Sequence, residues 1–239
     1  MNVSTADQEL IQIVNGPEPI TIADVAAKMD AINKVLPDND GLKWFNLLYL
    51  NVTQQVDVNS LPGGWEDPLW LTRLDVVFAQ LYFNAIADWL RNPVAVADSW
   101  KALFESRFTD GIDRIQFALA GMNAHINHDL ALALLQTDTE MNLTPLKDSP
   151  EHDDFENVNG LLETVLPQAL RFLATGVIGE AAQDTGKIGR FLAIWNVRAA
   201  RDLAWDVSDT LRPLNESARS VALAAQDQLT GVLGRSLLL

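Results

Sequence analysis

The three histidines of this chain all lie between residues 125 and 152. His125 and His128 are three residues apart with Asp129 directly after them, and His152 is followed by Asp153. Histidine close to carboxylate is the usual ligand set of zinc and non-haem iron, and it is also a common pair for acid–base catalysis. The pattern therefore indicates a site for metal binding or for proton transfer.

A helix predicted over residues 112–136 carries the first two histidines. It places His125 and Asp129 one turn apart, so that both side chains can point at one ion. Gly121 and Ala118 lie on the same face, and their small size leaves open space for a ligand or for a partner helix. The spacing lacks the glutamate of a His-Glu-x-x-His zinc site, so the pattern alone does not select one chemistry.

This predicted helix is apolar nearly all round, which is typical of a buried helix. A buried polar group that lacks a partner destabilises a fold by about 1–3 kcal/mol. Polar residues nevertheless crowd one segment of the helix: Asn123, His125, Asn127, His128 and Asp129. We interpret this cluster as functional. The alternative is that these side chains form only structural hydrogen bonds between helices.

We predict three overlapping sets of functional residues, drawn from this helix and from polar positions in other apolar segments. The predicted catalytic residues are His125, His128, Asp129, Asp75 and Tyr49. The predicted substrate-binding residues are Asn123, Asn127, Arg73 and Arg201. If a metal binds, zinc or iron suits histidine and carboxylate ligands better than calcium does. The predicted metal ligands are His125, Asp129, His152 and Asp153.

Several of these positions also have a structural interpretation. Asp153 can cap the next helix, and Arg73 can pair with Asp75 or with an exposed acid. Tyr49 is of a type that is usually a core residue with its hydroxyl at the edge. Arg201 can anchor an anionic substrate, or it can belong to a surface ion network. The sequence leaves these alternatives open.

The spacing of apolar residues is helical nearly everywhere, and the alternation typical of strands is absent. Residues 1–20 are expected to be a loosely ordered lead-in, and 137–151 a polar loop. The other predicted helices cover about 21–35, with Thr21 and Asp24 as a capping box, and then 41–58, 67–91, a segment that follows Pro93 and runs through Trp100 to about Phe108, 154–175, 187–211 and 214–237. The sequence therefore predicts one all-α domain over 1–239, a bundle of about seven or eight helices.

Composition excludes several classes of function. The net charge of −15 opposes binding to nucleic acid and to anionic membrane surfaces. No cysteine is present, which excludes disulfides, thiolate metal sites and a cysteine nucleophile. The N-terminal segment lacks the features of a secretory signal, and no apolar run reaches the length of a membrane span. We expect a cytoplasmic protein that acts on a small molecule, and the sequence leaves a homodimer open.

Five blocks of sequence resemble an uncharacterised bacterial family of all-helical domains. The blocks are Gly41–Asn46, Leu74–Ala79, Ile115–Leu130, His152–Phe155 and Val197–Trp205. The resemblance covers about residues 40–210, and the block around the first two histidines is the most specific. It implies a grouping and a helical fold, and it implies no activity.

The residues together favour a small-molecule enzyme with a buried histidine–aspartate site. With a metal, bound water would be activated for hydrolysis; without one, a histidine oriented by Asp129 would act as general base or acid in hydrolysis, elimination or cyclisation. The competing hypothesis is a non-catalytic module that binds a ligand or another protein. In that case the buried histidine and asparagine side chains only specify packing, and tryptophans line a ligand cavity or a dimer face.

Overall fold

The computed structural model describes residues 4–55, 64–175 and 196–239. Every regular element within these ranges is helical, which confirms the predicted all-α class. The α-helices are α1 (Thr5–Val14), α2 (Ile22–Val35), α3 (Gly41–Gln55), α4 (Pro68–Arg91), α5 (Asp98–Ser106), α6 (Arg114–Ala124), α7 (Leu130–Met141), α8 (Pro150–Thr175), α10 (Val197–Leu211) and α11 (Glu216–Leu237). A π-helical turn, His125–Asp129, joins α6 to α7 without a break. With α6 and α7 counted as one, the described residues form nine α-helices, slightly more than predicted.

Local capping signals explain where several helices begin. The Thr21 side chain accepts a hydrogen bond from the Asp24 amide, and the Asp24 carboxylate accepts one from the Thr21 amide, which is the predicted capping box of α2. At α4, Asp67 accepts from the amide of Trp70, and Pro68 occupies the first turn as predicted. These contacts involve near neighbours in sequence, so they can be predicted without the tertiary fold.

The prediction of a loosely ordered lead-in over residues 1–20 is wrong, because α1 forms inside it. Ser4 caps this helix by accepting a hydrogen bond from the Asp7 amide. Leu10 and Val14 lie one turn apart and are buried against the core, where α1 packs on α2 and α4. The helix is short, and its stability comes from this packing and not from its length.

The predicted loop over 137–151 is also too long. α7 continues to Met141 and ends at Asn142, whose φ of 54° is left-handed, a conformation that asparagine tolerates well. α8 begins at Pro150, and the Ser149 hydroxyl accepts a hydrogen bond from the His152 amide. His152 therefore belongs to the first turn of a helix. Parts of the helices predicted over 41–58 and 187–211 lie outside the described residues.

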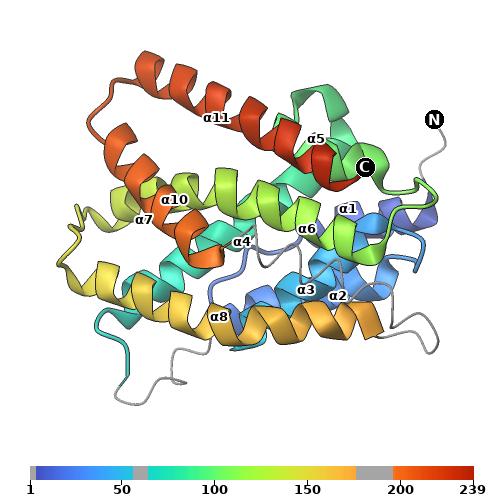
Figure 1. Cartoon of the computed structure of the whole chain (residues 1–239), viewed down its shortest axis with the longest axis horizontal. Coiled ribbons are helices and arrows are strands. Elements are labelled where there is room, and N and C mark those ends of the chain that lie inside the picture. Colours follow the sequence, from blue (N-terminus) through green and yellow to red (C-terminus); the bar gives the residue numbers. More distant parts are fainter. Residues whose placement is uncertain (1–3, 56–63, 176–195) are drawn as a thin grey trace.

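The helix made of α6, the π-turn and α7 runs through the middle of the molecule (Figure 1). α11 lies along one side of it and packs on α5 and α6, whereas α3 and α8 lie on the other side. α4 and α10 both pack against α7 and the π-turn. This surrounding explains why nearly every residue from Ile115 to Leu134 is buried, as the sequence predicts. No helix among the described residues is both long and apolar enough to cross a membrane.

Two glycine contacts bring α3 and α6 close together. A Cβ atom placed on Gly121 would lie 2.3 Å from Cγ of Phe45, and one on Gly41 would lie 2.3 Å from Cδ1 of Phe117. Each helix therefore offers a glycine to a phenylalanine ring of the other. The open space predicted beside Gly121 is filled by a partner helix, one of the two occupants that the sequence left open.

Candidate functional site

The five residues from His125 to Asp129 form a single π-helical turn in an otherwise α-helical rod. The amide of Leu130 donates to the carbonyl of His125, five residues earlier, instead of to the carbonyl four residues earlier. Such a turn inserts one residue into the helix and changes the direction of the side chains, and π-turns occur often at functional sites. Within this turn His125 and Asp129 are in direct contact, with Nδ1 of the histidine 2.9 Å from Oδ2 of the aspartate.

Asp129 is buried and accepts three hydrogen bonds. Its donors are Nδ1 of His125, Nδ1 of His128 at 3.0 Å and the indole Nε1 of Trp100 at 3.0 Å. Burial alone would raise the pKa of Asp129, but the hydrogen bonds from the two histidines outweigh it, and the pKa lies below its ordinary value. The carboxylate is therefore ionised at neutral pH and orients both imidazoles.

His125 is held as a neutral base. Burial lowers its pKa below the ordinary histidine value, and the contact with Asp129 offsets this only in part. Because Asp129 accepts from Nδ1, the lone pair of the neutral ring lies on Nε2, an atom that is buried and has no hydrogen-bond partner. Phe78 stacks on the ring with centroids 3.5 Å apart, and Tyr49 contacts it edge-on at 4.6 Å. The imidazole is therefore fixed in orientation.

His125 lines a cavity. The other lining residues come from α3, α4, the region of the π-turn, α8 and α10. The cavity measures about 90 Å³, counted as the space open to the centre of a water molecule. Thirteen of the eighteen lining residues are aliphatic, Met or Phe. The polar lining residues are Tyr49, Thr53, Asp75, His125 and Arg201. Four predicted site residues from four different segments are thus brought together.

Two more polar groups at the cavity resemble Nε2 of His125 in lacking a partner. Oδ2 of Asp75 and the hydroxyl of Tyr49 are both buried and form no hydrogen bond among the described residues. Burial raises the pKa of Asp75 to about 7, with the positive charge of Arg201 acting in the opposite direction. Burial and the nearby charge of Asp75 raise the pKa of Tyr49 well above its ordinary value, so it remains a phenol. The cavity therefore presents a base, a weak acid and a hydroxyl.

Arg201 contributes a buried cation to the same cavity. Its Nη2 donates to the Phe155 carbonyl at 3.3 Å, its Nε donates to Oδ1 of Asn159, and its guanidinium lies over the Phe155 ring at 4.1 Å. Burial lowers the pKa of Arg201 to about 10, and the negative charges of Glu156 and Asp202 oppose that effect. Arg201 therefore stays protonated at neutral pH. The structure places it in the interior, and not in the surface network considered from the sequence.

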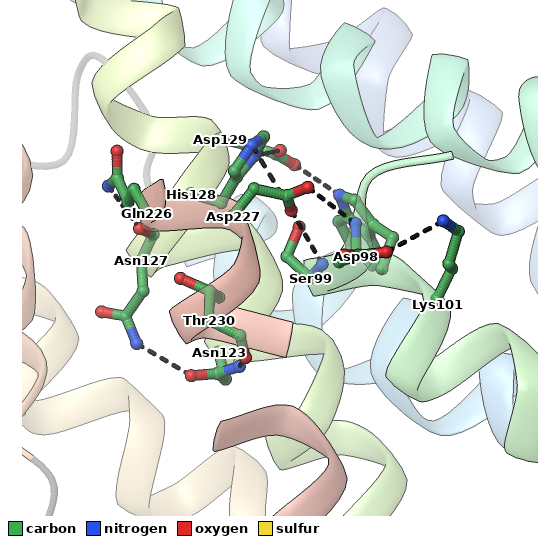
Figure 2. A network of polar contacts seen from close by, with 11 residues as sticks. Asp98, Ser99, Lys101, Asn123, Asn127, His128, Asp129, Gln226, Asp227 and Thr230 are labelled. Atoms are coloured by element: carbon green, nitrogen blue, oxygen red, sulfur yellow. Dashed lines mark hydrogen bonds and ion pairs between the residues drawn. The ribbon is translucent and has the colours of Figure 1, made fainter. Parts of the chain in front are cut away.

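The predicted substrate-binding asparagines do not line the cavity. Asn123 donates to the carbonyl of Thr230 at 2.9 Å and accepts from the amide of Asn127 at 3.0 Å. The carbonyl of Asn127 in turn accepts from the side chain of Gln226 at 2.6 Å. Figure 2 shows that these contacts face α11. Both asparagines therefore form hydrogen bonds of the kind that the sequence left as the structural alternative.

His128 also faces α11 (Figure 2). Its Nδ1 contacts Oδ1 of Asp129, and its Nε2 lies 3.7 Å from Oδ1 of Asp227. Asp227 accepts hydrogen bonds from the amides of Asp98 and Ser99, both at 2.8 Å, in the first turn of α5. Burial lowers the pKa of His128, but the two aspartates outweigh it and leave the pKa raised. His128 connects the Asp129 carboxylate to the α5–α11 pair and is not among the cavity residues.

Arg73 lies on the surface, where its Nε pairs with Oε2 of Glu140 at 2.6 Å. The side chains of both residues are more than a third exposed. Its partner is therefore an exposed acid, the structural interpretation given above, and Arg73 is absent from the cavity lining.

The four predicted metal ligands are not brought together. His152 packs edge-on against Trp205 at 4.6 Å and has Nε2 3.9 Å from Oε1 of Glu156, while Asp153 is exposed on α8. Both oxygens of Asp129 already accept hydrogen bonds. Across 4–55, 64–175 and 196–239, no group of three or more histidine, cysteine, aspartate or glutamate residues is placed to hold a metal ion. Zinc or iron binding remains a prediction.

Two parts of the site were missed by the sequence reasoning. Phe78, which stacks on His125, lies three residues after Asp75, and this helical spacing could have indicated it. Trp100 donates to Asp129 from 29 positions away in sequence, and no local pattern reports that contact. The tryptophans expected to line a cavity do not line this one; leucine, valine, phenylalanine and methionine form most of its apolar wall.

Comparison with known proteins identifies a family. No curated protein and no solved structure matches the chain. Residues 22–239 match the sequence profile of a family of unknown function, DUF5995. The match spans most of the chain and includes the blocks around Trp44, Asp75, His125, His152 and Trp205. The chain therefore belongs to DUF5995, a family of unknown function with a helical fold.

Proposed function

We propose that this protein is an acid–base enzyme that acts on a small, largely apolar molecule held in the cavity. One observation carries the proposal: His125 Nε2, Asp75 Oδ2 and the Tyr49 hydroxyl are all buried without a partner, and all three residues line one cavity. A bound ligand with polar groups would supply the partners that the fold does not. Perturbed titratable groups in an apolar pocket are typical of active sites.

The three groups differ from the other unpaired buried polar atoms in lying on residues that line one cavity. Leaving a buried polar atom unpaired costs about 1–3 kcal/mol, and three such atoms lie at one cavity. Asn123 and Asp129, by contrast, have their buried side-chain atoms in hydrogen bonds. Seven other buried side-chain atoms of the described residues also lack a partner, but none of their residues lines this cavity. The gathering of three unpaired groups on the lining of one cavity is what favours a ligand there.

The mechanism we propose is a paired proton transfer. Nε2 of His125, neutral and oriented by Asp129, removes a proton from the ligand or from a bound water. The protonated carboxyl of Asp75 donates a proton to a leaving or developing oxygen, and the Tyr49 hydroxyl donates a hydrogen bond to it. The imidazolium then returns its proton to Asp75, so no further reactant is needed. Elimination and cyclisation follow this scheme directly, and hydrolysis follows it when water is the nucleophile.

The proposal is tested by proton exchange, which requires no knowledge of the natural product. The protein is incubated in heavy water with a panel of small apolar ketones and oxo acids, and proton NMR follows the loss of the signal next to the carbonyl. We expect catalysed exchange with at least one compound. His125→Gln should reduce it by roughly 10²–10⁴-fold, the range for removing a general base. Asp153→Asn, an exposed aspartate outside the cavity, is the matched control and should leave the rate unchanged.

The pH dependence of this exchange follows from the two pKa values. His125 must be neutral to act as the base. Because burial lowers its pKa, the exchange rate should reach its full value at a pH below the ordinary pKa of histidine. Asp75 must be protonated, so the rate should fall as pH rises through about 7. Full exchange in His125→Gln would contradict the proposal. Ligand binding without exchange in any compound would favour the non-catalytic binding module instead.

A further inference from the structure

Arg201 differs from the other strongly buried arginine of the described residues in having no carboxylate partner. Arg107, which is 3% exposed, forms ion pairs with Asp7 and Asp40. Arg201 is 6% exposed, and its two hydrogen bonds go to neutral oxygens of Asn159 and Phe155. Among the described residues its Nη1 forms no hydrogen bond. Within the same ranges, no carboxylate oxygen lies within 4.0 Å of a guanidinium nitrogen, the distance that defines an ion pair. Glu156, Asp202 and Asp75 act on this charge without a direct ion pair, so the guanidinium can still accept an anionic partner in the cavity.

The remainder of the cavity defines what can approach this cation. Its walls are largely apolar, with Leu48 and Val52 of α3 and Leu162 and Leu166 of α8 among the lining residues. If each water-sized group needs about 10–15 Å³, the volume of about 90 Å³ accommodates roughly six to nine such groups. A guanidinium binds carboxylate through two parallel hydrogen bonds, and an apolar wall of this kind favours a hydrocarbon tail. The charge of Arg201 and the apolar walls therefore both favour a carboxylate that carries a hydrocarbon tail.

We propose that the cavity binds a small monocarboxylic acid with an apolar tail, with its carboxylate on Arg201 and its tail against α3 and α8. This names the substrate class of the function proposed above and rests on that proposal in taking the cavity as the site. Asp75 and Nε2 of His125 then face the part of the ligand that follows the carboxylate. Arg201 holds the ligand, and His125 and Asp75 carry out the proton transfer.

Isothermal titration calorimetry tests this inference by comparing the affinities of the protein for hexanoate and for its neutral counterpart hexanamide. We expect hexanoate to bind the unmodified protein at least about tenfold more tightly than hexanamide, because only the carboxylate pairs with the guanidinium. Arg201→Met should abolish that preference, whereas hexanamide binding should change little. Arg198→Met is the matched control, since Arg198 lies one turn earlier on α10 and pairs with Glu156 and Glu163 on a partly exposed surface.

Two further measurements keep this test decisive. If Arg201→Met does not fold, Arg201→Lys retains the charge without the planar fork, and it should bind hexanoate less tightly than the unmodified protein does. His125→Gln should bind hexanoate as the unmodified protein does while losing proton exchange, which separates failure of the ligand class from failure of the catalytic proposal. Equal binding of hexanoate and hexanamide, or no binding of hexanoate at millimolar concentration, would overturn the inference.

Discussion

Replacing Asp129 with alanine is expected to destabilise the fold by roughly 3–5 kcal/mol, the range for removing one partner from a buried charged network. The substitution leaves the indole of Trp100 and Nδ1 of both His125 and His128 without an acceptor. Urea unfolding followed by circular dichroism measures the loss of stability. Proton exchange should also disappear, because nothing would then orient the imidazole of His125.

A milder substitution separates stability from chemistry. Asp129→Asn keeps the shape of the side chain, but its amide group can donate to Nδ1 of His125 and so favours the tautomer whose proton is on Nε2. We expect a roughly 10²–10⁴-fold loss of exchange in a folded protein. Asp138→Ala is the matched control, since Asp138 is equally buried and accepts from the indole of Trp70 at 3.0 Å and from Arg212 at 2.8 Å. It should destabilise the protein and leave exchange by the folded fraction intact.

Asp75→Asn is expected to stabilise the protein above neutral pH while removing its activity. Burial raises the pKa of Asp75 from 3.8 to about 7, so the folded state favours the protonated carboxyl. Its contribution to stability is present in full below the unfolded pKa and is lost as pH rises through about 7. A shift of this size corresponds to about 4 kcal/mol. Because Asp75 as a whole is only partly buried, we expect about 2–3 kcal/mol.

The test compares free energies of unfolding for the unmodified protein and Asp75→Asn across the pH range. The two curves should converge towards pH 4 and separate above pH 7, with Asp75→Asn the more stable. Asp153→Asn removes an exposed carboxylate and should follow the unmodified curve at every pH. If Asp75→Asn is less stable than the unmodified protein at high pH, the carboxylate has a partner in the folded state and is not poised as an acid. A gain in stability with a loss of activity is typical of a catalytic residue.

The parts of the site that the sequence predicts are those determined by local spacing. His125 and Asp129 contact each other because they lie four residues apart on a helix, and the capping box at Thr21 is likewise local. Asp75 and Tyr49, which the sequence shows as polar positions in apolar segments, both line the cavity. The π-turn was not predicted, because an ordinary helix and a π-turn have the same apolar pattern over five residues.

The roles assigned to the other polar residues depended on contacts between distant segments. Asn123 and Asn127 lie on the same helix as His125, yet α11 covers their face of that helix, more than ninety positions later in the chain. His152 is directed towards Trp205 because α8 begins earlier than predicted. Which helix covers which face is decided by the packing of the entire bundle, and no short pattern in one segment reports it.

The same π-turn makes contacts with α11 and contributes a residue to the cavity. Towards α11, His128 and Asp227 connect the turn to the first residues of α5. His125 lines the cavity, and its Nε2 is buried without a hydrogen-bond partner among the described residues. Asp129 contacts both histidines, so the group that orients the proposed base is itself held by the packing of α11 and α5.

The central claim is that His125 presents a neutral, unprotonated Nε2 to the cavity, and NMR of the histidine ring nitrogens tests it most directly. The chain has only three histidines, so the substitution His125→Gln identifies the signal. At neutral pH we expect a proton on Nδ1, a lone pair on Nε2, and a change in the Nε2 signal when hexanoate is added. A proton on Nε2, or a doubly protonated ring at neutral pH, would contradict the account.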